Sequence, residues 1–188
     1  MATRELQGKH IAFLMTDGVE QVEYTKPREF VEEHGAKATL VTPKPQGEKI
    51  QGFNHLAQGD AFTSEMDVRD AQSDKFDALV LPGGVANPDQ LRMNKEAIRF
   101  IADFARQDKP IAAICQGPWT LIDADLAKGK RLTSWPSLRQ DLANAGAEWT
   151  DEKVVVDGKL VTSRKPDDIP AFNQALLDQL SRAERRAA

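Results

Sequence analysis

The chain has 188 residues, of which 40% are hydrophobic and 29% charged, and its formal net charge is −4. This length predicts one domain over residues 1–188, and the composition excludes a disordered chain. The negative charge argues against nucleic acid as a partner, and no apolar run approaches the roughly 20 residues that span a bilayer. The single cysteine excludes an intramolecular disulfide and a zinc site built from several thiolates. Because the N-terminus is polar and has no apolar signal core, we expect a cytoplasmic protein without a membrane partner.

Apolar runs bounded by turn residues predict the strands of a sheet. In chain order, these strands cover 10–15, 38–42, 77–81 and 110–114. Helical patterns occupy 20–34, 94–107 and 117–126, and a last one covers 169–180. Pro27 lies inside the first pattern, so that helix is expected to begin near Pro27 or to be kinked there. Helices that alternate with fully apolar strands predict an α/β sandwich, whose mostly parallel sheet is covered on both faces.

Two segments depart from this alternation. Residues 154–162 contain two β-branched runs joined through Asp157 and Gly158, which predicts a β-hairpin. Residues 47–59 are polar and rich in turn residues, and they predict either a second hairpin or a long connection.

The fourth predicted strand is followed by Cys115, Gln116, Gly117 and Pro118. An apolar strand, a nucleophilic residue, one intervening residue and a glycine that opens a helix form the pattern of a nucleophile elbow. Such a turn requires a positive φ at Cys115, and the helix N-terminus favours a thiolate, so we expect a thiol pKa below about 8.5. The same pattern also fits a cysteine buried as a small apolar residue at a strand end.

Two further strand ends carry unusual residues, and sites in parallel sheets form beyond the carboxyl ends of the strands. Pro82-Gly83-Gly84 is either a plain turn or a backbone that directs N–H groups at a developing oxyanion. Glu20 is either a solvated charge or a desolvated carboxyl that shares a proton with the thiol. No G-x-G-x-x-G pattern follows the first strand, so NAD and FAD are not expected.

The three histidines, His10, His34 and His55, all precede Cys115. A triad whose histidine follows the cysteine cannot be formed, which argues against a glutamine amidotransferase or glutaminase. His10 and His34 are expected to be structural or exposed, whereas His55 is a candidate pocket residue.

Six segments together resemble one family. They are DGVEQVE (17–23), ALVLPGG (78–84), AICQGP (113–118), LTSWP (132–136), DLANAGA (141–147) and VVVDGKLVTSR (154–164). Through them the chain resembles the ThiJ/PfpI family, in its intracellular protease I and general stress protein branch. The resemblance implies a flavodoxin-like three-layer sandwich, a dimer or larger assembly, and a reactive cysteine on an elbow. Members of the family have been described as cysteine peptidases, cofactor-independent glyoxalases, protein deglycases, chaperones and oxidative-stress proteins.

The resemblance also implies roles for particular residues. Cys115 and Glu20 would be the catalytic pair, and the oxyanion backbone would be that of Gly84 and Gln116. A carboxylate supplied by a neighbouring subunit in the peptidase branch falls near Asp89.

Two positions depart from the peptidase branch. That branch has histidine directly after the cysteine, where this chain has Gln116, which cannot titrate and so cannot act as a general base. The position of a pocket tyrosine falls on Trp135, which offers an N–H donor but no titratable hydroxyl. Both changes weaken the peptidase interpretation without removing the thiol or Glu20.

The sequence therefore predicts a stress-response protein that uses Cys115 on reactive carbonyls, senses peroxide by oxidation of Cys115, or does both. A cysteine peptidase or amidase is the alternative. None of these activities requires a cofactor or a metal. The expected partners are a second copy of the chain, small carbonyl compounds and damaged proteins.

Overall fold

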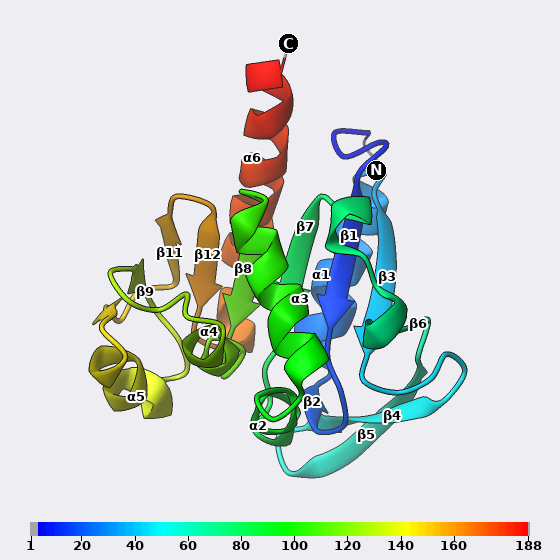
Figure 1. Ribbon diagram of the computed structural model, residues 1–188, viewed down its shortest axis with the longest axis horizontal. Helices are drawn as coiled ribbons and strands as arrows, with labels where there is room; N and C mark the ends of the chain where they lie inside the picture. The colour runs from blue at the N-terminus through cyan, green and yellow to red at the C-terminus, as the bar shows by residue number, and fades with distance from the viewer. Residues whose placement is uncertain (1–3, 188) are drawn as a thin grey trace.

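The computed structural model describes residues 4–187 and is built around a seven-stranded sheet. The strands are β1 (His10–Leu14), β3 (Lys37–Thr42), β6 (Met66–Asp67), β7 (Ala78–Leu81), β8 (Ile111–Ile114), β11 (Val154–Asp157) and β12 (Leu160–Ser163). Their order is β11-β12-β8-β7-β1-β3-β6, and every pair is parallel except β11–β12 (Figure 1). The central order β3-β1-β7-β8-β12 is that of flavodoxin-like sheets. The α/β fold with a mostly parallel sheet is confirmed.

Helices cover both faces of the sheet. They are α1 (Val22–Glu33), α2 (Ala86–Leu91), α3 (Lys95–Arg106), α4 (Trp119–Asp123), α5 (Arg139–Asn144) and α6 (Ile169–Ala187). Figure 1 shows α3 in front of the sheet and α1 behind it. Among residues 4–187, no helix is long and apolar enough to cross a membrane.

Strand β1 shows why two cores form. Its side chains alternate between the faces, so Ile11 and Phe13 join the core that α1 and α6 cover, whereas Ala12 and Leu14 join the core under α3. All four side chains are buried. A strand with both faces covered reads as an unbroken apolar run, which is why it stood out in the sequence.

The structure excludes a start near Pro27 for the first expected helix and shortens the third. Helix α1 begins before Pro27, because the N–H groups of Tyr24 and Thr25 already donate to Gln21 O and hold the first turn. Helix α4 is shorter than the expected segment 117–126, because Asp125 adopts a left-handed conformation with φ of 58° and ends it.

The β11–β12 hairpin is confirmed, and residues 47–59 form part of a second hairpin. Strands β2 (Val19–Glu20), β4 (Lys49–Asn54) and β5 (Ala57–Thr63) make a small sheet in the order β2-β4-β5. Figure 1 shows this sheet across the carboxyl edge of the main sheet, beside α2. Strands β9 (Arg131–Leu132) and β10 (Glu148–Trp149) pair separately. Single 3₁₀ turns occupy Val68–Asp70, Ser73–Lys75, Pro136–Leu138 and Pro166–Asp168.

Candidate active site

Cys115 lies on a sharp turn at the carboxyl end of β8. Its φ is 62°, the positive value expected of an elbow, and its side chain is 8% exposed. The turn is held on both sides, because Cys115 N–H donates to Ser163 O at 3.0 Å and Cys115 O accepts from Trp135 N–H at 2.7 Å. A Cβ at Gly117 would lie 2.3 Å from Leu81 O, so only glycine fits at this position of the turn. The elbow geometry is confirmed.

Backbone N–H groups from two loops converge on the sulfur. The N–H groups of Gly84 and Gln116 hydrogen-bond to Cys115 and lower the pKa of its thiol. Gly84 adopts a φ of 84° and lies so close to the loop after β1 that an added Cβ would be 2.2 Å from Gly18 O. The Gln116 side chain also accepts from the thiol, with 3.8 Å between Sγ and Oε1. Both N–H groups are therefore placed where an oxyanion could be stabilised.

The carboxyl group beside the thiol is that of Glu23, in the first turn of α1. Glu23 is 0% exposed, and its Oε1 accepts from Gly83 N–H at 2.9 Å. Burial raises the pKa of Glu23 to about 8, and the charge of Glu20 adds to this against the opposing Gly83 N–H. Oε2 is buried without a hydrogen-bond partner among the described residues. Glu23 is therefore a neutral acid near pH 7 and has a proton to donate.

The thiol and Glu23 influence each other's proton. Burial raises the pKa of Cys115, and the charge of an ionised Glu23 raises it further, which outweighs the N–H groups of Gly84 and Gln116. The expectation of a thiol pKa below its usual value is therefore wrong for this geometry. A thiolate forms here only when Glu23 keeps its proton and donates it toward the sulfur, since two buried negative charges repel each other.

Glu20 lies in the same site but at a different place. It belongs to β2, and its carboxylate accepts the backbone N–H of His55 at 3.0 and 3.3 Å. The structure thus puts Glu23, rather than Glu20, in contact with the thiol. The sequence held a signal for this: Glu23, Pro27 and Val31 are spaced four apart, and all three are buried on one face of α1.

A cavity of about 420 Å³ opens above the thiol. Of the residues expected in the site, it is lined by Cys115, Glu20, Gly84, Gln116, His55 and Trp135. Asp89 is exposed on α2 and does not line the cavity. The rim is apolar and unusually exposed, with Leu56 at 98% and Val85 at 63%.

Sequence reasoning also missed Asn87, a fully buried residue of α2. Its Oδ1 accepts from Thr16 N–H at 2.7 Å, and its Nδ2 donates to the carbonyls of Pro82 and Gly83 at 3.1 and 3.0 Å. Asn87 thus ties the loop after β1 to the loop after β7, and this fixes the Gly84 N–H relative to the sulfur.

Comparison with known proteins gives one consistent family. The model of the DJ-1/PfpI family matches residues 9–179. "Putative cysteine protease YraA" of Bacillus subtilis is 41% identical over 172 residues, covering 92% of this chain and 98% of the relative. General stress protein 18 of Bacillus subtilis is also 41% identical, over 176 residues, covering 93% of this chain and 99% of the relative.

Solved structures agree with the fold. Drosophila melanogaster DJ-1beta has a TM-score of 0.80 and 29% identity, covering 92% of this chain and 90% of that one. A two-domain protein from Anabaena variabilis, with a DJ-1/ThiJ/PfpI-like and a ferritin-like domain, has a TM-score of 0.85 and 35% identity. The match covers 92% of this chain but 48% of that longer protein.

Proposed function

Because the chain belongs to the DJ-1/PfpI family, we propose that it is a stress-response protein whose Cys115 attacks small reactive carbonyl compounds. The observation that carries the proposal is the contact between the thiol and the neutral acid Glu23, beneath a cavity where two backbone N–H groups converge. Such a site can form a carbon–sulfur bond and protonate the resulting oxygen without a histidine. The stress-protein name of the Bacillus relative agrees with this role.

A 2-oxoaldehyde such as methylglyoxal illustrates the proposed steps. The Cys115 thiol first releases its proton to water. Its sulfur then bonds to the aldehyde carbon, and the aldehyde oxygen takes a proton from Glu23, giving a hemithioacetal. The Glu23 carboxylate then removes the hydrogen on that carbon as a proton and returns it to the neighbouring carbon, while the hydroxyl proton of the first carbon passes to the ketone oxygen. This oxidises the first carbon to a thioester and reduces the ketone to an alcohol. Water hydrolyses the thioester and releases lactate and the thiol. The net reaction therefore combines methylglyoxal with one water molecule and needs no other reactant.

Lactate formation tests the proposal directly. The purified protein should convert methylglyoxal to lactate, and Cys115→Ser should abolish this conversion while retaining the fold by circular dichroism. Glu20→Gln is the matched control for Glu23→Gln, because both carboxyl groups line the cavity but Glu23 contacts the sulfur. Lactate production that persists in Cys115→Ser, or its absence in the parent protein, would contradict the proposal.

We propose peroxide sensing as a second role of the same thiol. The thiolate attacks one peroxide oxygen and hydroxide leaves, which gives a sulfenic acid, and a second peroxide gives the sulfinic acid. The N–H groups of Gly84 and Gln116 support this role, because they can hydrogen-bond the added oxygens. Mass spectrometry after mild peroxide should locate one or two oxygens on Cys115, and unmodified Cys115 after such treatment would refute the role.

A cysteine peptidase or amidase is the alternative, favoured by the name of one Bacillus relative and by the place of His55 beside the cavity. No hydrogen bond joins the His55 ring to Cys115 within residues 4–187, and Gln116 cannot act as a base. The alternative would gain support from peptide cleavage that Cys115→Ser and His55→Ala both abolish. Because a single cysteine suits a reducing compartment, we propose that the protein acts in the cytoplasm.

A further inference from the structure

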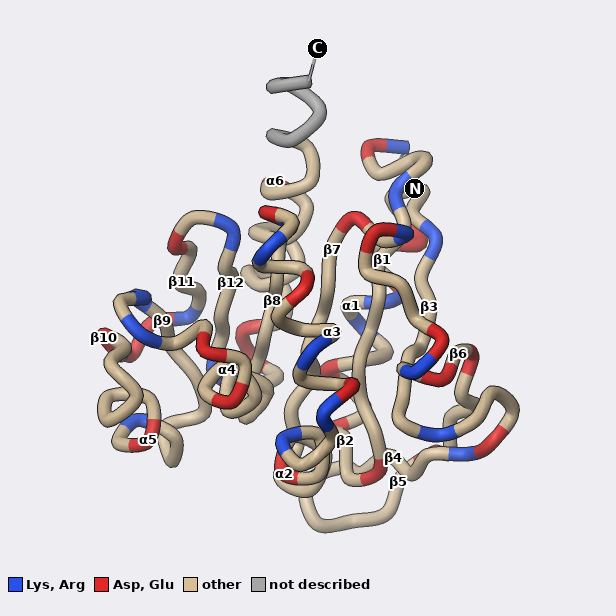
Figure 2. Tube along the Cα trace, in the orientation of Figure 1, with Lys and Arg blue, Asp and Glu red and all other residues tan. Residues whose placement is uncertain are grey.

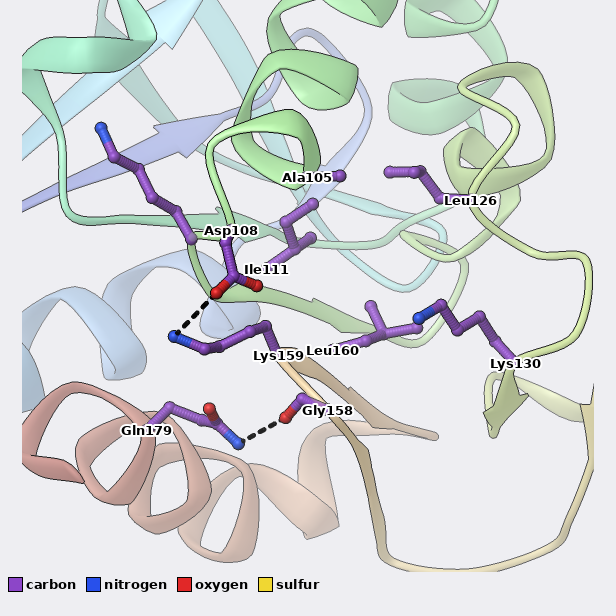
Figure 3. A pocket seen from close by; sticks show the side chains of 10 residues that line it. Ala105, Asp108, Ile111, Leu126, Lys130, Gly158, Lys159, Leu160 and Gln179 are labelled. Atoms are coloured by element: carbon purple, nitrogen blue, oxygen red, sulfur yellow. Dashed lines mark hydrogen bonds and ion pairs between the residues drawn. The ribbon is translucent and has the colours of Figure 1, made fainter. Parts of the chain in front are cut away.

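A second cavity, of about 440 Å³, lies at the opposite edge of the sheet from the thiol (Figure 3). Ile111 and Leu160 begin the parallel strands β8 and β12 and form its floor, whereas Cys115 follows the other end of β8. Leu126 and Ala105 complete the apolar part of the lining. Nothing in the proposed carbonyl chemistry uses this cavity.

Three lysines line this cavity, and two of them have partners. Lys109 Nζ donates to Ser73 O at 2.9 Å. Lys159 Nζ lies 3.9 Å from Asp108 Oδ2, as the dashed line in Figure 3 shows. The half-buried Lys130 has no side-chain partner among the residues that the structure describes, and its amine points toward Leu160 across the cavity (Figure 3). The cavity therefore holds an ammonium group without a counterion.

The pairing of Lys159 is weak enough to be exchanged. The Asp108 side chain is 85% exposed, and exposed ion pairs at such distances contribute at most about 1 kcal/mol. With three lysines against Asp108, the lining is locally positive in a chain whose net charge is −4. Figure 2 shows basic and acidic segments side by side at the tip of the β11–β12 hairpin, where Lys159 lies. An anion that enters meets the unpaired ammonium group of Lys130, and Lys159 is held to Asp108 only weakly.

The backbone around the cavity is fixed before any ligand arrives. Ile111 N–H donates to Lys159 O at 3.0 Å, and Glu148 N–H donates to Lys130 O at 2.8 Å. On the third side, Gln179 Nε2 donates to Gly158 O at 2.9 Å, which holds the hairpin tip against α6 (Figure 3). A ligand would therefore order few groups beyond the lysine side chains, which lowers the entropic cost of binding.

We propose that this cavity binds a small organic anion with a compact apolar body and a carboxylate or phosphate group. The body packs against Leu126, Ile111 and Leu160, and the charged group pairs with the ammonium of Lys130. Lys159 joins it by turning away from Asp108. Ammonium groups act as point charges rather than as the planar fork of arginine, so the site accepts either anionic group.

Titration followed by ¹H–¹⁵N NMR tests this site with benzoate and phenyl phosphate as probes. Both probes should shift the amide signals of Gly158, Lys130 and Leu126 until the site is saturated. The probe with the lower dissociation constant identifies the preferred anionic group. The signals of Gly84 and Gln116, at the thiol, should not move. Neutral benzyl alcohol should bind at least about threefold more weakly, because it lacks the charge interaction, which is modest at an exposed site.

Variants separate this site from unspecific binding. Lys130→Met and Lys159→Met should each weaken the preferred probe about three- to tenfold, whereas Lys128→Met, an exposed lysine outside the lining, should not change it. Ala105→Trp starts from an exposed position and fills the cavity, so it should abolish binding without removing a core side chain. The proposal is wrong if neither probe saturates at millimolar concentration, if the shifts lie at Gly84, or if both lysine variants bind like the parent.

Discussion

Glu23 and Cys115 lie in contact beneath the cavity: the charge of an ionised Glu23 raises the pKa of the thiol, whereas a hydrogen bond with the thiol lowers the pKa of Glu23. A neutral Glu23 can donate to a thiolate, whereas an ionised Glu23 keeps the sulfur protonated. The Glu20 carboxylate accepts the His55 N–H, and its charge raises the pKa of Glu23. The two carboxyl groups are therefore expected to differ sharply when each is replaced by an amide.

Glu23→Gln should lower the rate of methylglyoxal conversion about 10²- to 10⁴-fold, because the amide cannot take and return a proton. Glu20→Gln should change it by less than about tenfold, because its removal leaves the sulfur's contacts in place. Steady-state lactate assays on matched preparations measure both. Equal losses in the two variants would contradict the assignment of proton transfer to Glu23.

The raised pKa of Glu23 makes the fold depend on pH. The folded state keeps this proton up to about pH 8, while the unfolded state releases it near 4.5, so stability is present at low pH and is lost as pH rises across that window. The loss is at most about 1.4 kcal/mol per pH unit. Urea unfolding between pH 5 and 8 should show this slope in the parent protein and not in Glu23→Gln.

His10 provides an internal check on that measurement. Burial lowers the pKa of His10, so its contribution to stability rises with pH, with the opposite sign to that of Glu23. Glu23→Gln should therefore leave a shallow rise with pH near 6. An unchanged fall in the variant would show that some other group causes the pH dependence.

Gln116→His should raise any peptidase activity, because it puts a titratable base beside the thiol near neutral pH. The Gln116 side chain already reaches the sulfur, at 3.8 Å, so a ring at this position is within range. Cleavage of fluorogenic peptides compares the variant with the parent, and Gln116→Asn serves as the control. Parent cleavage through Cys115 that the histidine does not improve would contradict this prediction.

At the level of elements, the elbow joins β8 to α4 through a glycine that has no room for a side chain. A Cβ at Gly117 would lie 2.3 Å from Leu81 O and 2.9 Å from Ile114 O, both of them backbone atoms that cannot turn aside. The nucleophile is thus positioned by close contact between two strand ends. Any residue larger than glycine must push β7 and β8 apart at the site.

Gly117→Ala should destabilise the protein by about 2 kcal/mol or more, in the range of overpacking substitutions, and should also lower the reactivity of the thiol. Gly129→Ala is the control: it meets nothing within 4 Å, and its φ of 77° costs about 1 kcal/mol through backbone strain alone. Urea unfolding and the rate of Cys115 alkylation measure the two effects. A variant as stable and as reactive as Gly129→Ala would show that the contact is not restrictive.

The sequence predicted the structure best for the strands whose two faces are both covered by helices. Strands β7 and β8 are unbroken apolar runs, β1 is apolar after His10, and β3 is mostly apolar between its polar ends. The ends of all four agree with the predicted ranges within one residue. Helix ends were harder to predict, because they depend on the hydrogen bonds that Gln21 O accepts and on the left-handed conformation of Asp125. Neither feature follows from periodicity. The elbow was predictable because its glycine is a steric necessity.

The acid partner was not predictable in the same way. Glu20 follows the loop after the first strand, where sites usually form, but it belongs to β2, which pairs with β4 and directs its carboxylate to His55. Glu23 was concealed as an ordinary acidic residue in the first turn of a helix. Its burial depends on where α1 lies against the sheet, which is a property of the packed chain.

For the whole molecule, we propose that two or more copies associate close to α1 and the elbow, as the family resemblance implied. The exposed Leu56 and Val85 beside the site agree with a face that another surface covers. Light scattering at micromolar concentration should give at least a dimer, and Leu56→Glu should shift it toward the monomer. Val156→Glu, at an exposed apolar position on the edge strand β11, should not. A parent protein that is monomeric under these conditions would contradict the proposal.

The small β2-β4-β5 sheet crosses the carboxyl edge of the main sheet and supplies Phe53, His55 and Leu56 to the cavity wall. The reacting groups, by contrast, belong to the main sheet and to α1. The residues that react and the residues that select the substrate therefore lie on separate parts of the fold. Substitutions in the hairpin tip can therefore change which substrate enters the cavity while the reacting residues beneath it stay the same.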